Sequence, residues 1–565
     1  MTELRQHTDA GRVSRLQRLG DVALSRLLRL PPVRTEYTVR RGLRVPMRDG
    51  VELLADHYAP DTDRPAGTIL MRSPYGRGML SSLLFGQLYA SRGYHIVVQS
   101  VRGTFGSGGT LSPMTYEKDD GLDTAAWLRG QPWYTGGFAM LGVSYGAMAG
   151  WALMDDPPPD VTAVIAIVGP HDASRISWDT GAFALADTLG WSHQVAYQEK
   201  VGRWQKLLAV SRTNDALDSA LSEFPLGDAA RKLLGDSAPW YREWIEHRDK
   251  ADPYWTPTRF DGALEKITVP VLLITGWQDA FLTQTLDQYT RLRERGVNVA
   301  LTVGSWSHLS MLTTAIGDVS LETLNWLDRH VAGRAGTSVR SPVRASITND
   351  TWVELPHWPP QTEDQYWYLG CGGSLVSFES GYSGAASKFR FDPGSPTPAP
   401  GGPFLSSAGG YQDDTDLARR DDVLSFITEP LPADVYLMGS PTVDLIHSAD
   451  NPHADVFVRV SEVNSRGKSR NVTDGFRRLT ASAAAAPVRI ELDSVAHRFR
   501  IGSRIRLVIA GGAHPRFSRN TGTAESPWDA ERFTAVTHTV HHGEGLHSRL
   551  TMPTTDGRPS STAVS

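Results

Sequence analysis

A chain of 565 residues exceeds what one hydrophobic core supports, so we expect two to four domains. The formal net charge of −5 offers no electrostatic basis for nucleic-acid binding. Cys371 is the only cysteine, which excludes an intrachain disulfide and a cysteine-rich metal site and fits a reducing compartment.

Residues 1–35 are expected to form a helical extension. Apolar side chains recur there at steps of three and four residues, and arginines line the opposite side. The apolar stripe comprises Val13, Leu16, Leu19, Ala23, Leu27 and Leu30. We expect the helix to pack against its own domain and to end at Pro31-Pro32; the alternative is a helix lying on a membrane surface. The segment lacks the apolar core and cleavage site of a secretory signal, and no run in the chain approaches the roughly 20 apolar residues of a membrane span, so we expect a cytoplasmic protein.

Residues 36–170 and 263–340 carry the pattern of one α/β domain. Its first part reads as antiparallel strands around the turn Arg48-Asp49-Gly50. Short, nearly continuous apolar runs then alternate with helix-like stretches, which predicts strands buried on both faces of a parallel sheet. The runs are residues 67–73, 95–101, 138–144, 161–169, 269–276 and 298–304.

Two further regions differ from this pattern. Residues 171–262 are rich in tryptophan, mostly helical by period, and lie between two predicted strands of the sheet, so we expect an inserted cap. Residues 341–552 carry strand-like runs and turns without helical partners, which predicts an all-β sandwich or jelly roll. The polar tail, residues 553–565, is expected to be disordered.

The stretch "LGVSYGAMAG", residues 141–150, has the spacing of a nucleophile elbow. Ser144 lies between Gly142 and Gly146, after an apolar strand and before a helix-forming run. In such a turn the flanking residues must be small, and the serine hydroxyl is exposed at the N-terminus of the following helix. We therefore predict Ser144 as a nucleophile rather than as part of a glycine-rich turn.

A nucleophilic serine needs a base, and the base needs an orienting carboxylate. Asp279 follows the strand-like run "VPVLLITG", and His308 follows the next such run. The order Ser144, Asp279, His308 is the order found in α/β-hydrolases. His171, which also follows a predicted strand, is the rival base.

Three histidines in "THTVHHGEG" have the composition of a metal cluster. Alternation along a strand would separate His538, His541 and His542 between the two faces of a sheet. We therefore interpret them as solvated strand histidines, and we expect neither a metal nor a cofactor.

An oxyanion hole needs two hydrogen-bond donors. The backbone N–H of Tyr145 is one donor by the geometry of the elbow. The second donor usually arises after the first buried strand, where "MRSPYGRG" places Tyr75. From the residues alone, Tyr75 is either this donor or a packing aromatic.

These motifs together resemble the cocaine-esterase-like serine hydrolases, the family that also holds the X-Pro dipeptidyl-peptidases and the α-amino-acid ester hydrolases. The resemblance runs from about residue 40 to about residue 550, through "SPYGR", "DGLDTAAWLRGQPW", "LGVSYGA", "GWQDAF", "GSWSH", "GSPTVDLIHSADNPHADVFVRVSEV" and "HPRFSRNTGT". It implies an α/β-hydrolase core with an inserted helical cap and a C-terminal jelly-roll domain. It also implies a triad of Ser144, His308 and Asp279, with Tyr75 as the side-chain donor beside the Tyr145 amide.

The resemblance also bears on the substrate. Phe281 occupies the position that lines the acyl pocket in cocaine-esterase-like members, and Trp178 and Phe183 are further candidates from their place in the cap. The α-amino-acid ester hydrolases have carboxylates just after the triad acid, whereas residues 280–283 are uncharged in this chain. A neutral acyl group therefore fits better than a cationic one.

One position departs from the family pattern. The family commonly has an aspartate in "D-x-R-G", and this chain has Ser100 there. We therefore expect Arg102 to lack a nearby carboxylate.

The sequence thus predicts a serine esterase that forms an acyl-enzyme with a small-molecule ester and does not bind nucleic acid. An X-Pro-type peptidase or amidase, an acyltransferase, and a sugar-binding protein with an inactive core are the alternatives. A homodimer is left open.

Overall fold

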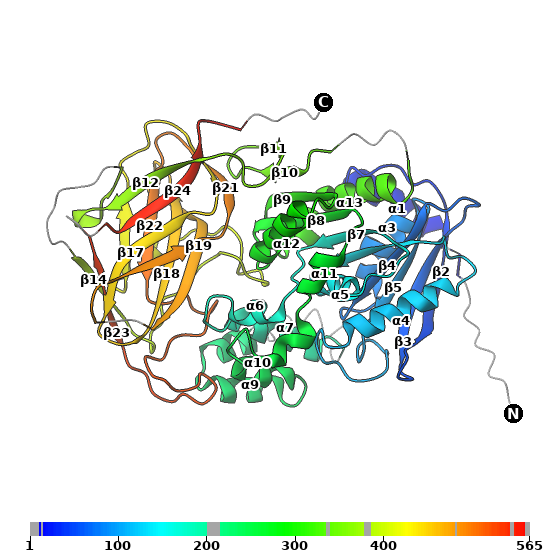
Figure 1. Ribbon diagram of the computed structural model, residues 1–565, viewed down its shortest axis with the longest axis horizontal. Coiled ribbons are helices and arrows are strands. Elements are labelled where there is room, and N and C mark those ends of the chain that lie inside the picture. Colours follow the sequence, from blue (N-terminus) through cyan, green and yellow to red (C-terminus); the bar gives the residue numbers. More distant parts are fainter. Residues whose placement is uncertain are drawn as a thin grey trace.

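The computed structural model describes residues 11–12, 15–199, 215–334, 340–377, 386–480, 483–542 and 547–559. Figure 1 shows an α/β lobe and a β-rich lobe, with a group of helices from residues 173–246 placed between them. The fold is therefore an α/β core with a helical insertion and a C-terminal β domain, as predicted.

The α/β core is built on an 11-stranded sheet within the described residues, in the order β1-β2-β3-β5-β4-β6-β7-β8-β9-β10-β11. In this order the strands from β5 to β10 are parallel to one another, whereas β3 and β11 are antiparallel to the strands beside them. The apolar runs predicted as buried strands form β4 to β9. The strands are β1 (Gly11–Arg12), β2 (Tyr37–Pro46), β3 (Glu52–Pro60), β4 (Gly67–Ser73), β5 (Tyr94–Ser100), β6 (Phe138–Val143), β7 (Val161–Ile167), β8 (Val271–Gln278), β9 (Val299–Ser307), β10 (Val343–Ser346) and β11 (Trp352–Leu355).

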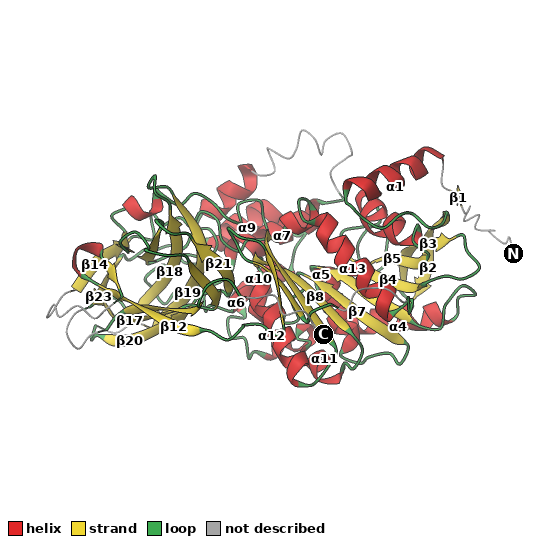
Figure 2. Ribbon diagram, turned by 90° about the horizontal axis from the view of Figure 1, so that it is seen from above, coloured by secondary structure: helices red, strands yellow, loops and turns green. Residues whose placement is uncertain are grey.

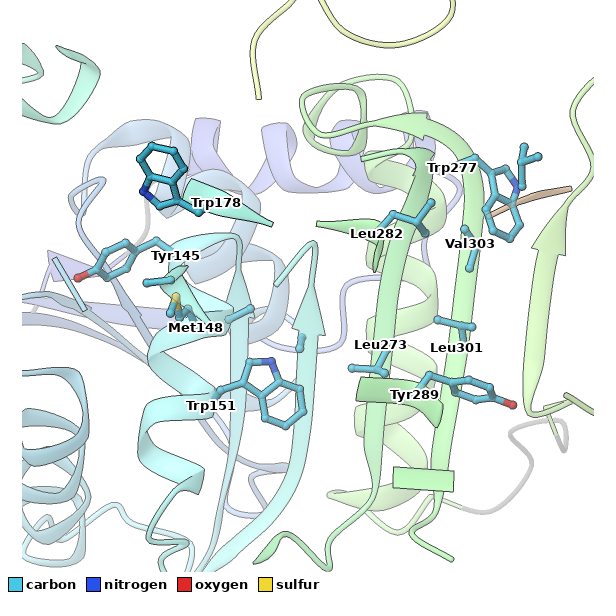
Figure 3. Packing of buried hydrophobic residues seen from close by; sticks show 14 of the residues in the cluster. Tyr145, Met148, Trp151, Trp178, Leu273, Trp277, Leu282, Tyr289, Leu301 and Val303 are labelled. Carbon is cyan, nitrogen blue, oxygen red and sulfur yellow. The ribbon is translucent and has the colours of Figure 1, made fainter. Parts of the chain in front are cut away.

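Alternation along these strands divides the core between the two faces of the sheet. Leu70 packs on the face that carries α4, α5, α11 and α12, whereas Ile69 and Met71 pack on the face that carries α3 and α13. Figure 3 shows the buried side chains of Tyr145, Met148 and Trp151 following one another along α5. The helices are α2 (Met79–Ser81), α3 (Leu88–Ala90), α4 (Glu117–Arg129), α5 (Tyr145–Met154), α11 (Asp261–Lys266), α12 (Leu282–Glu294) and α13 (Ile316–His330), with a π-helix, η1 (Ser82–Gln87), between α2 and α3 and a 3₁₀ turn, η3 (Ser310–Leu312), before α13.

The insertion between β7 and β8 is helical. Its elements are α6 (Ala173–Trp178), α7 (Leu185–Tyr197), α9 (Leu226–Leu234), α10 (Trp240–Glu246) and the 3₁₀ helix η2 (Pro253–Thr258). Their shared interior is aromatic, and the ring of Trp191 lies 5.8 Å from Trp244 and 6.2 Å from Trp240. The cap thus has a small core of its own beside the sheet.

The C-terminal domain contains a 9-stranded and a 4-stranded sheet within the described residues. The larger sheet comprises β12 (Glu363–Leu369), β13 (Leu375–Val376), β14 (Ala386–Phe391), β16 (Val435–Gly439), β17 (Thr442–Ala449), β20 (Ala486–Glu491), β21 (Val495–Phe499), β23 (Val536–His541) and β24 (Arg549–Thr555). The smaller sheet comprises β15 (Val423–Ile427), β18 (His453–Val463), β19 (Ser469–Thr480) and β22 (Arg504–Ala510). Two short 3₁₀ turns, η4 (Cys371–Gly373) and η5 (Leu417–Arg419), complete this domain.

Both ends of the β region differ from the sequence prediction. β10 and β11 follow residue 340 but join the α/β sheet, because β10 pairs in parallel with β9. At the other end, residues 553–555 are not disordered, since Pro553 pairs with Asp364 and Thr554 with Glu363 in an ordered strand. Residues 560–565 of the predicted tail lie outside the described residues.

The N-terminal helix α1 (Arg15–Leu27) packs on the core with a different face from the predicted one. Leu19 and Leu27 are 67 % and 78 % exposed, whereas Asp21 and Ser25 are buried. The Tyr37 hydroxyl donates to Asp21 at 3.0 Å, and an Arg92 Nη2 donates to the Ser25 hydroxyl at 2.9 Å. These polar partners on the core decide which face is turned inward. Figure 2 shows α1 at the edge of the α/β lobe, far from the β domain.

Val13, also part of the predicted stripe, lies outside the described residues. No helix among the described residues is long and apolar enough to cross a membrane.

Candidate active site

Ser144 occupies the tight turn between β6 and α5. Its φ of 55° and ψ of −121° are a strained conformation for a residue with a side chain. A Cβ on Gly142 would lie 2.3 Å from the Gly146 carbonyl oxygen, and a Cβ on Gly146 would lie 2.9 Å from the Arg72 carbonyl oxygen. Only glycine fits at both positions, so the sequence pattern has a direct steric cause. The turn leaves the Ser144 hydroxyl at the N-terminus of α5.

His308 and Asp279 meet Ser144 at the carboxyl edge of the sheet. His308 follows β9, and its Nε2 lies 3.1 Å from the Ser144 Oγ. Asp279 follows β8, and its Oδ1 lies 2.7 Å from the His308 Nδ1. The Thr275 hydroxyl donates to the other carboxylate oxygen, Oδ2, at 2.9 Å. The three side chains form one hydrogen-bonded chain, in which His308 and Asp279 are buried.

The rival histidine has other partners. His171 is buried, and its Nδ1 lies 3.1 Å from the Gln288 Nε2. Its Nε2 faces Asp287 at 3.5 Å and Asp261 at 3.6 Å. His171 therefore contacts α12 through a hydrogen bond and approaches acids on α11 and α12, whereas His308 contacts the serine.

Tyr75 lies beside the nucleophile, and a cap residue fixes its hydroxyl. The Trp191 indole N–H donates to the Tyr75 hydroxyl oxygen at 3.0 Å. Burial raises the pKa of Tyr75, and hydrogen bonds with Trp191 and Ser144 partly oppose that rise. The phenol is therefore protonated at neutral pH, and its O–H is free to donate toward the site because Trp191 occupies an acceptor lone pair. Sequence reasoning missed Trp191, which comes from α7 in the cap.

A buried ion pair supports the Tyr145 amide. Arg72, at the end of β4, pairs with Glu117 at 3.0 Å, and both side chains are excluded from solvent. The Tyr145 hydroxyl donates to Glu117 at 2.8 Å and accepts from the Met114 N–H at 2.8 Å. Burial raises the pKa of Glu117, and Arg72 opposes this rise. The segment before Tyr75 and the first residue of α5 are thus tied to the same carboxylate.

The three predicted pocket residues differ in their surroundings. The Phe281 ring is buried and stands edge-on to His308, with centroids 5.3 Å apart. Trp178 (Figure 3) is buried in the cap core. Its indole N–H donates to the Trp244 carbonyl at 2.8 Å. Phe183 is fully buried with its ring 5.1 Å from Trp178. Contact of Trp178 and Phe183 with a substrate stays a prediction.

The expectation that Arg102 lacks a carboxylate is wrong. Its guanidinium donates to Asp120 at 2.6 Å and 3.1 Å and to Asp49 at 2.7 Å. Asp120 comes from α4, so the sequence neighbourhood of Arg102 did not reveal it. Ser100 accepts a hydrogen bond from Arg77, which also pairs with Asp56 at 3.2 Å. The serine therefore belongs to a different arginine's network.

Two of the three predicted histidines, His538 and His542, are not solvated, whereas His541 is half-buried. His538 is fully buried, lies 3.0 Å from a His447 ring nitrogen and stacks on Phe389. His542 is also buried, and its Nε2 lies 2.9 Å from the Ser387 hydroxyl. Burial lowers the pKa of His538 to about 3, so its imidazole is neutral. Among the described residues, no group of three or more His, Cys, Asp or Glu side chains is placed to hold a metal ion.

The β domain clamps the loop that carries Asp279. The side-chain amide of Gln278, directly before Asp279, donates to the Val472 carbonyl at 2.9 Å. The side-chain amide of Asn471 donates to the side-chain oxygen of Gln278, Oε1, at 3.1 Å. Within the α/β sheet itself, the Trp277 indole N–H donates to the Ser346 carbonyl of β10 at 2.7 Å. Side chains on both sides of the site thus depend on contacts between domains.

The arrangement has the parts needed for acyl transfer. A hydroxyl contacts an imidazole, the imidazole contacts a buried carboxylate, and a protonated phenol and a helix N-terminal amide lie beside the hydroxyl.

Comparison with known proteins gives concordant results over most of the chain. Residues 49–310 match the model of the X-Pro dipeptidyl-peptidase (S15 family), and residues 337–551 match the X-Pro dipeptidyl-peptidase C-terminal non-catalytic domain. Cocaine esterase from Rhodococcus sp. is 27 % identical over 571 residues, covering 92 % of this chain and 98 % of that protein.

Solved structures share the fold at lower identity. An aminopeptidase from a marine sediment archaeon, Thaumarchaeota archaeon, superposes with a TM-score of 0.79 at 21 % identity, covering 92 % of this chain and 96 % of that chain. An α-amino acid ester hydrolase superposes with a TM-score of 0.78 at 20 % identity, covering 92 % of this chain and 97 % of that chain.

Proposed function

Because the chain belongs to the cocaine-esterase-like serine hydrolases related to the X-Pro dipeptidyl-peptidases, we propose that it hydrolyses carboxylic esters through an acyl-enzyme on Ser144. The observation that carries the proposal is the continuous contact from the Ser144 Oγ through the His308 ring to Asp279, with distances of 3.1 Å and 2.7 Å.

In the proposed reaction, His308 Nε2 takes the proton as the Ser144 Oγ bonds to the ester carbonyl carbon. Tyr75 and the Tyr145 N–H stabilise the negative charge on the carbonyl oxygen. The C–O bond to the alcohol then breaks, and His308 returns the proton to the departing oxygen. Water, deprotonated by His308, then attacks the acyl carbon. The bond from that carbon to the Ser144 Oγ breaks, His308 returns the proton to the Oγ, and the carboxylic acid is released. Asp279 holds the imidazole and stabilises its positive charge.

The acyl group is proposed to be neutral. Phe281 stands edge-on to His308 and offers apolar surface beside the reacting atoms. Its neighbours Ala280, Leu282 and Thr283 carry no charge, so the loop after Asp279 provides no partner for a cation. An aliphatic or aromatic acyl group matches this lining.

A panel of substrates tests the proposal with the full-length protein. We expect turnover of 4-nitrophenyl butanoate and 4-nitrophenyl benzoate, and little or no cleavage of glycyl-proline 4-nitroanilide. Cleavage of the anilide alone would favour the X-Pro-type peptidase. Labelling by a serine-directed phosphonate without turnover of any compound would point to acyl transfer with an alcohol acceptor. The absence of both labelling and turnover would contradict catalysis at Ser144.

Replacing Tyr75 by phenylalanine is expected to lower kcat by about 10²–10³-fold with little change in KM, because the donor acts on the oxyanion rather than on the bound ester. Steady-state hydrolysis of 4-nitrophenyl butanoate measures this effect. Tyr134→Phe is the matched control, since the Tyr134 hydroxyl donates to Asp160 at 2.6 Å, away from the site. A decrease no larger than that of the control would remove Tyr75 from the oxyanion hole.

A further inference from the structure

Asp187 is an acidic residue on the face of α7 that turns toward the site. It lies in the first turn of the helix, and Trp191 follows it by four residues. Side chains four positions apart lie on the same face of a helix. Since Trp191 reaches the Tyr75 hydroxyl at 3.0 Å, Asp187 stands one helical turn from a residue of the site.

Asp187 also lies where three segments meet. Its Oδ1 accepts the Leu405 N–H at 2.8 Å, from a loop of the β domain. The same loop reaches the His308 segment, since a Cβ on Gly410 would lie 3.5 Å from the Ser307 Cβ. The charges of His308 and Asp279 both act on the Asp187 carboxyl. Asp187 is therefore within electrostatic range of the reacting groups while it keeps part of its surface accessible.

The charge of Asp187 has little compensation from the protein. No basic side chain of the described residues forms an ion pair with it. Arg516 lies within electrostatic range, but its guanidinium is 3.3 Å from Asp474 and 3.7 Å from Asp493. Burial raises the pKa of Asp187 to about 6, with the Leu405 N–H, Arg516 and His308 opposing the rise. At neutral pH most molecules thus hold an under-compensated carboxylate beside the site, which an incoming cation would stabilise.

We propose that Asp187 is a specificity-determining residue that binds a positively charged ammonium group of the ester substrate. This inference rests on the proposed function, because it places the ammonium in a substrate that reaches Ser144. The loop after Asp279 is uncharged, so the cap and the β domain would supply the recognition instead. Since the acyl group is proposed to be neutral, we expect the ammonium in the alcohol part of the ester, and the test examines the acyl part as well.

Binding to the Ser144→Ala protein tests the proposal independently of turnover. The probes are butanoylcholine against its neutral isostere 3,3-dimethylbutyl butanoate, and phenyl 4-(trimethylammonio)butanoate against phenyl 5,5-dimethylhexanoate. We expect butanoylcholine to bind with a Kd about tenfold lower than that of its isostere, as a charge pair in a partly enclosed site provides. A preference within the second pair instead would place the ammonium in the acyl group and contradict the proposed neutral acyl group.

The Asp187→Asn change is expected to abolish the preference. Asparagine keeps the size of the side chain and an acceptor for the Leu405 N–H, but it removes the charge. Asp228→Asn is the matched control, since Asp228 is an exposed acid on α9 that pairs with Arg231. A preference that survives Asp187→Asn, or the absence of any preference in the Ser144→Ala protein, would overturn the proposal. Failure of ester turnover in the wild-type panel would instead overturn the proposed function.

The pH dependence provides a second readout that does not require the Asp187 variant to fold. A group with a raised pKa near 6 loses its negative charge as the pH falls through that value, so the preference should decrease from pH 7.5 to pH 5. His308, Arg516 and Asp279 are the other charged or titratable groups whose charges act on the Asp187 carboxyl. An unchanged preference at pH 5 would contradict the role of Asp187.

Discussion

Replacing Ser144 by alanine is expected to lower kcat for 4-nitrophenyl butanoate by about 10⁴–10⁶-fold, with KM changed far less. The reason is that the Ser144 hydroxyl contacts the His308 Nε2 at 3.1 Å, in a turn whose φ of 55° holds that hydroxyl outward. Alanine removes the oxygen that bonds to the acyl group, while the oxyanion donors and the substrate contacts stay in place.

Initial rates with site titration by a phosphonate measure this effect, because titration quantifies any contaminating wild-type enzyme. The matched control is Ser222→Ala, an exposed serine whose hydroxyl donates to the Asp218 carbonyl at 3.1 Å. We expect the control to keep wild-type rates. Residual activity within about tenfold of wild type in Ser144→Ala would assign the nucleophile to another residue.

The second large effect is expected for Asp279→Asn, with kcat lowered by about 10⁴-fold. Asp279 accepts from the His308 ring at 2.7 Å and from the Thr275 hydroxyl at 2.9 Å. An asparagine in this place can turn its NH₂ toward the His308 Nδ1, which stabilises the tautomer protonated at Nε2. That tautomer cannot accept the serine proton, and the charge that stabilises the imidazolium is also lost.

The labelling rate with a phosphonate and kcat with 4-nitrophenyl butanoate should decrease together in Asp279→Asn. Asp287→Asn is the control, because Asp287 lies on the helix after the same loop and pairs with Arg175 at 2.9 Å. Equal activities of the two variants would show that Asp279 does not orient the base. A loss of kcat with normal labelling would place the function of Asp279 in the second half of the reaction.

The parts of the site that depend on local sequence could be predicted. The turn at Ser144 requires glycine at two fixed positions, and Asp279 and His308 come directly after apolar strands, so short windows contain the signal. The buried strands of the α/β sheet were predictable for the same reason, since burial on both faces demands continuous apolar runs.

Contacts between distant segments left no such signal. Trp191 donates a hydrogen bond to Tyr75 although the two residues are 116 positions apart in the sequence. No periodicity distinguishes Trp191 from the other aromatic residues of the cap. Arg102 pairs with Asp120, which lies on the helix α4. The absence of an aspartate at position 100 therefore did not mean that Arg102 lacks a carboxylate partner. Likewise, the face of α1 that turns inward depends on Arg92 and Tyr37, which lie outside the helix.

The hydrogen bonds between Gln278 and the strand that contains Asn471 and Val472 also have an evolutionary consequence. Gln278, the residue before Asp279, is held by the β domain, which contributes none of the three side chains Ser144, His308 and Asp279. The two halves therefore constrain each other's sequence, and recombination that exchanged the β domain for a distant relative's would alter the placement of the acid. Lineages of this chain should inherit the catalytic and β domains together, and substitutions at Gln278 should be accompanied by changes at Asn471.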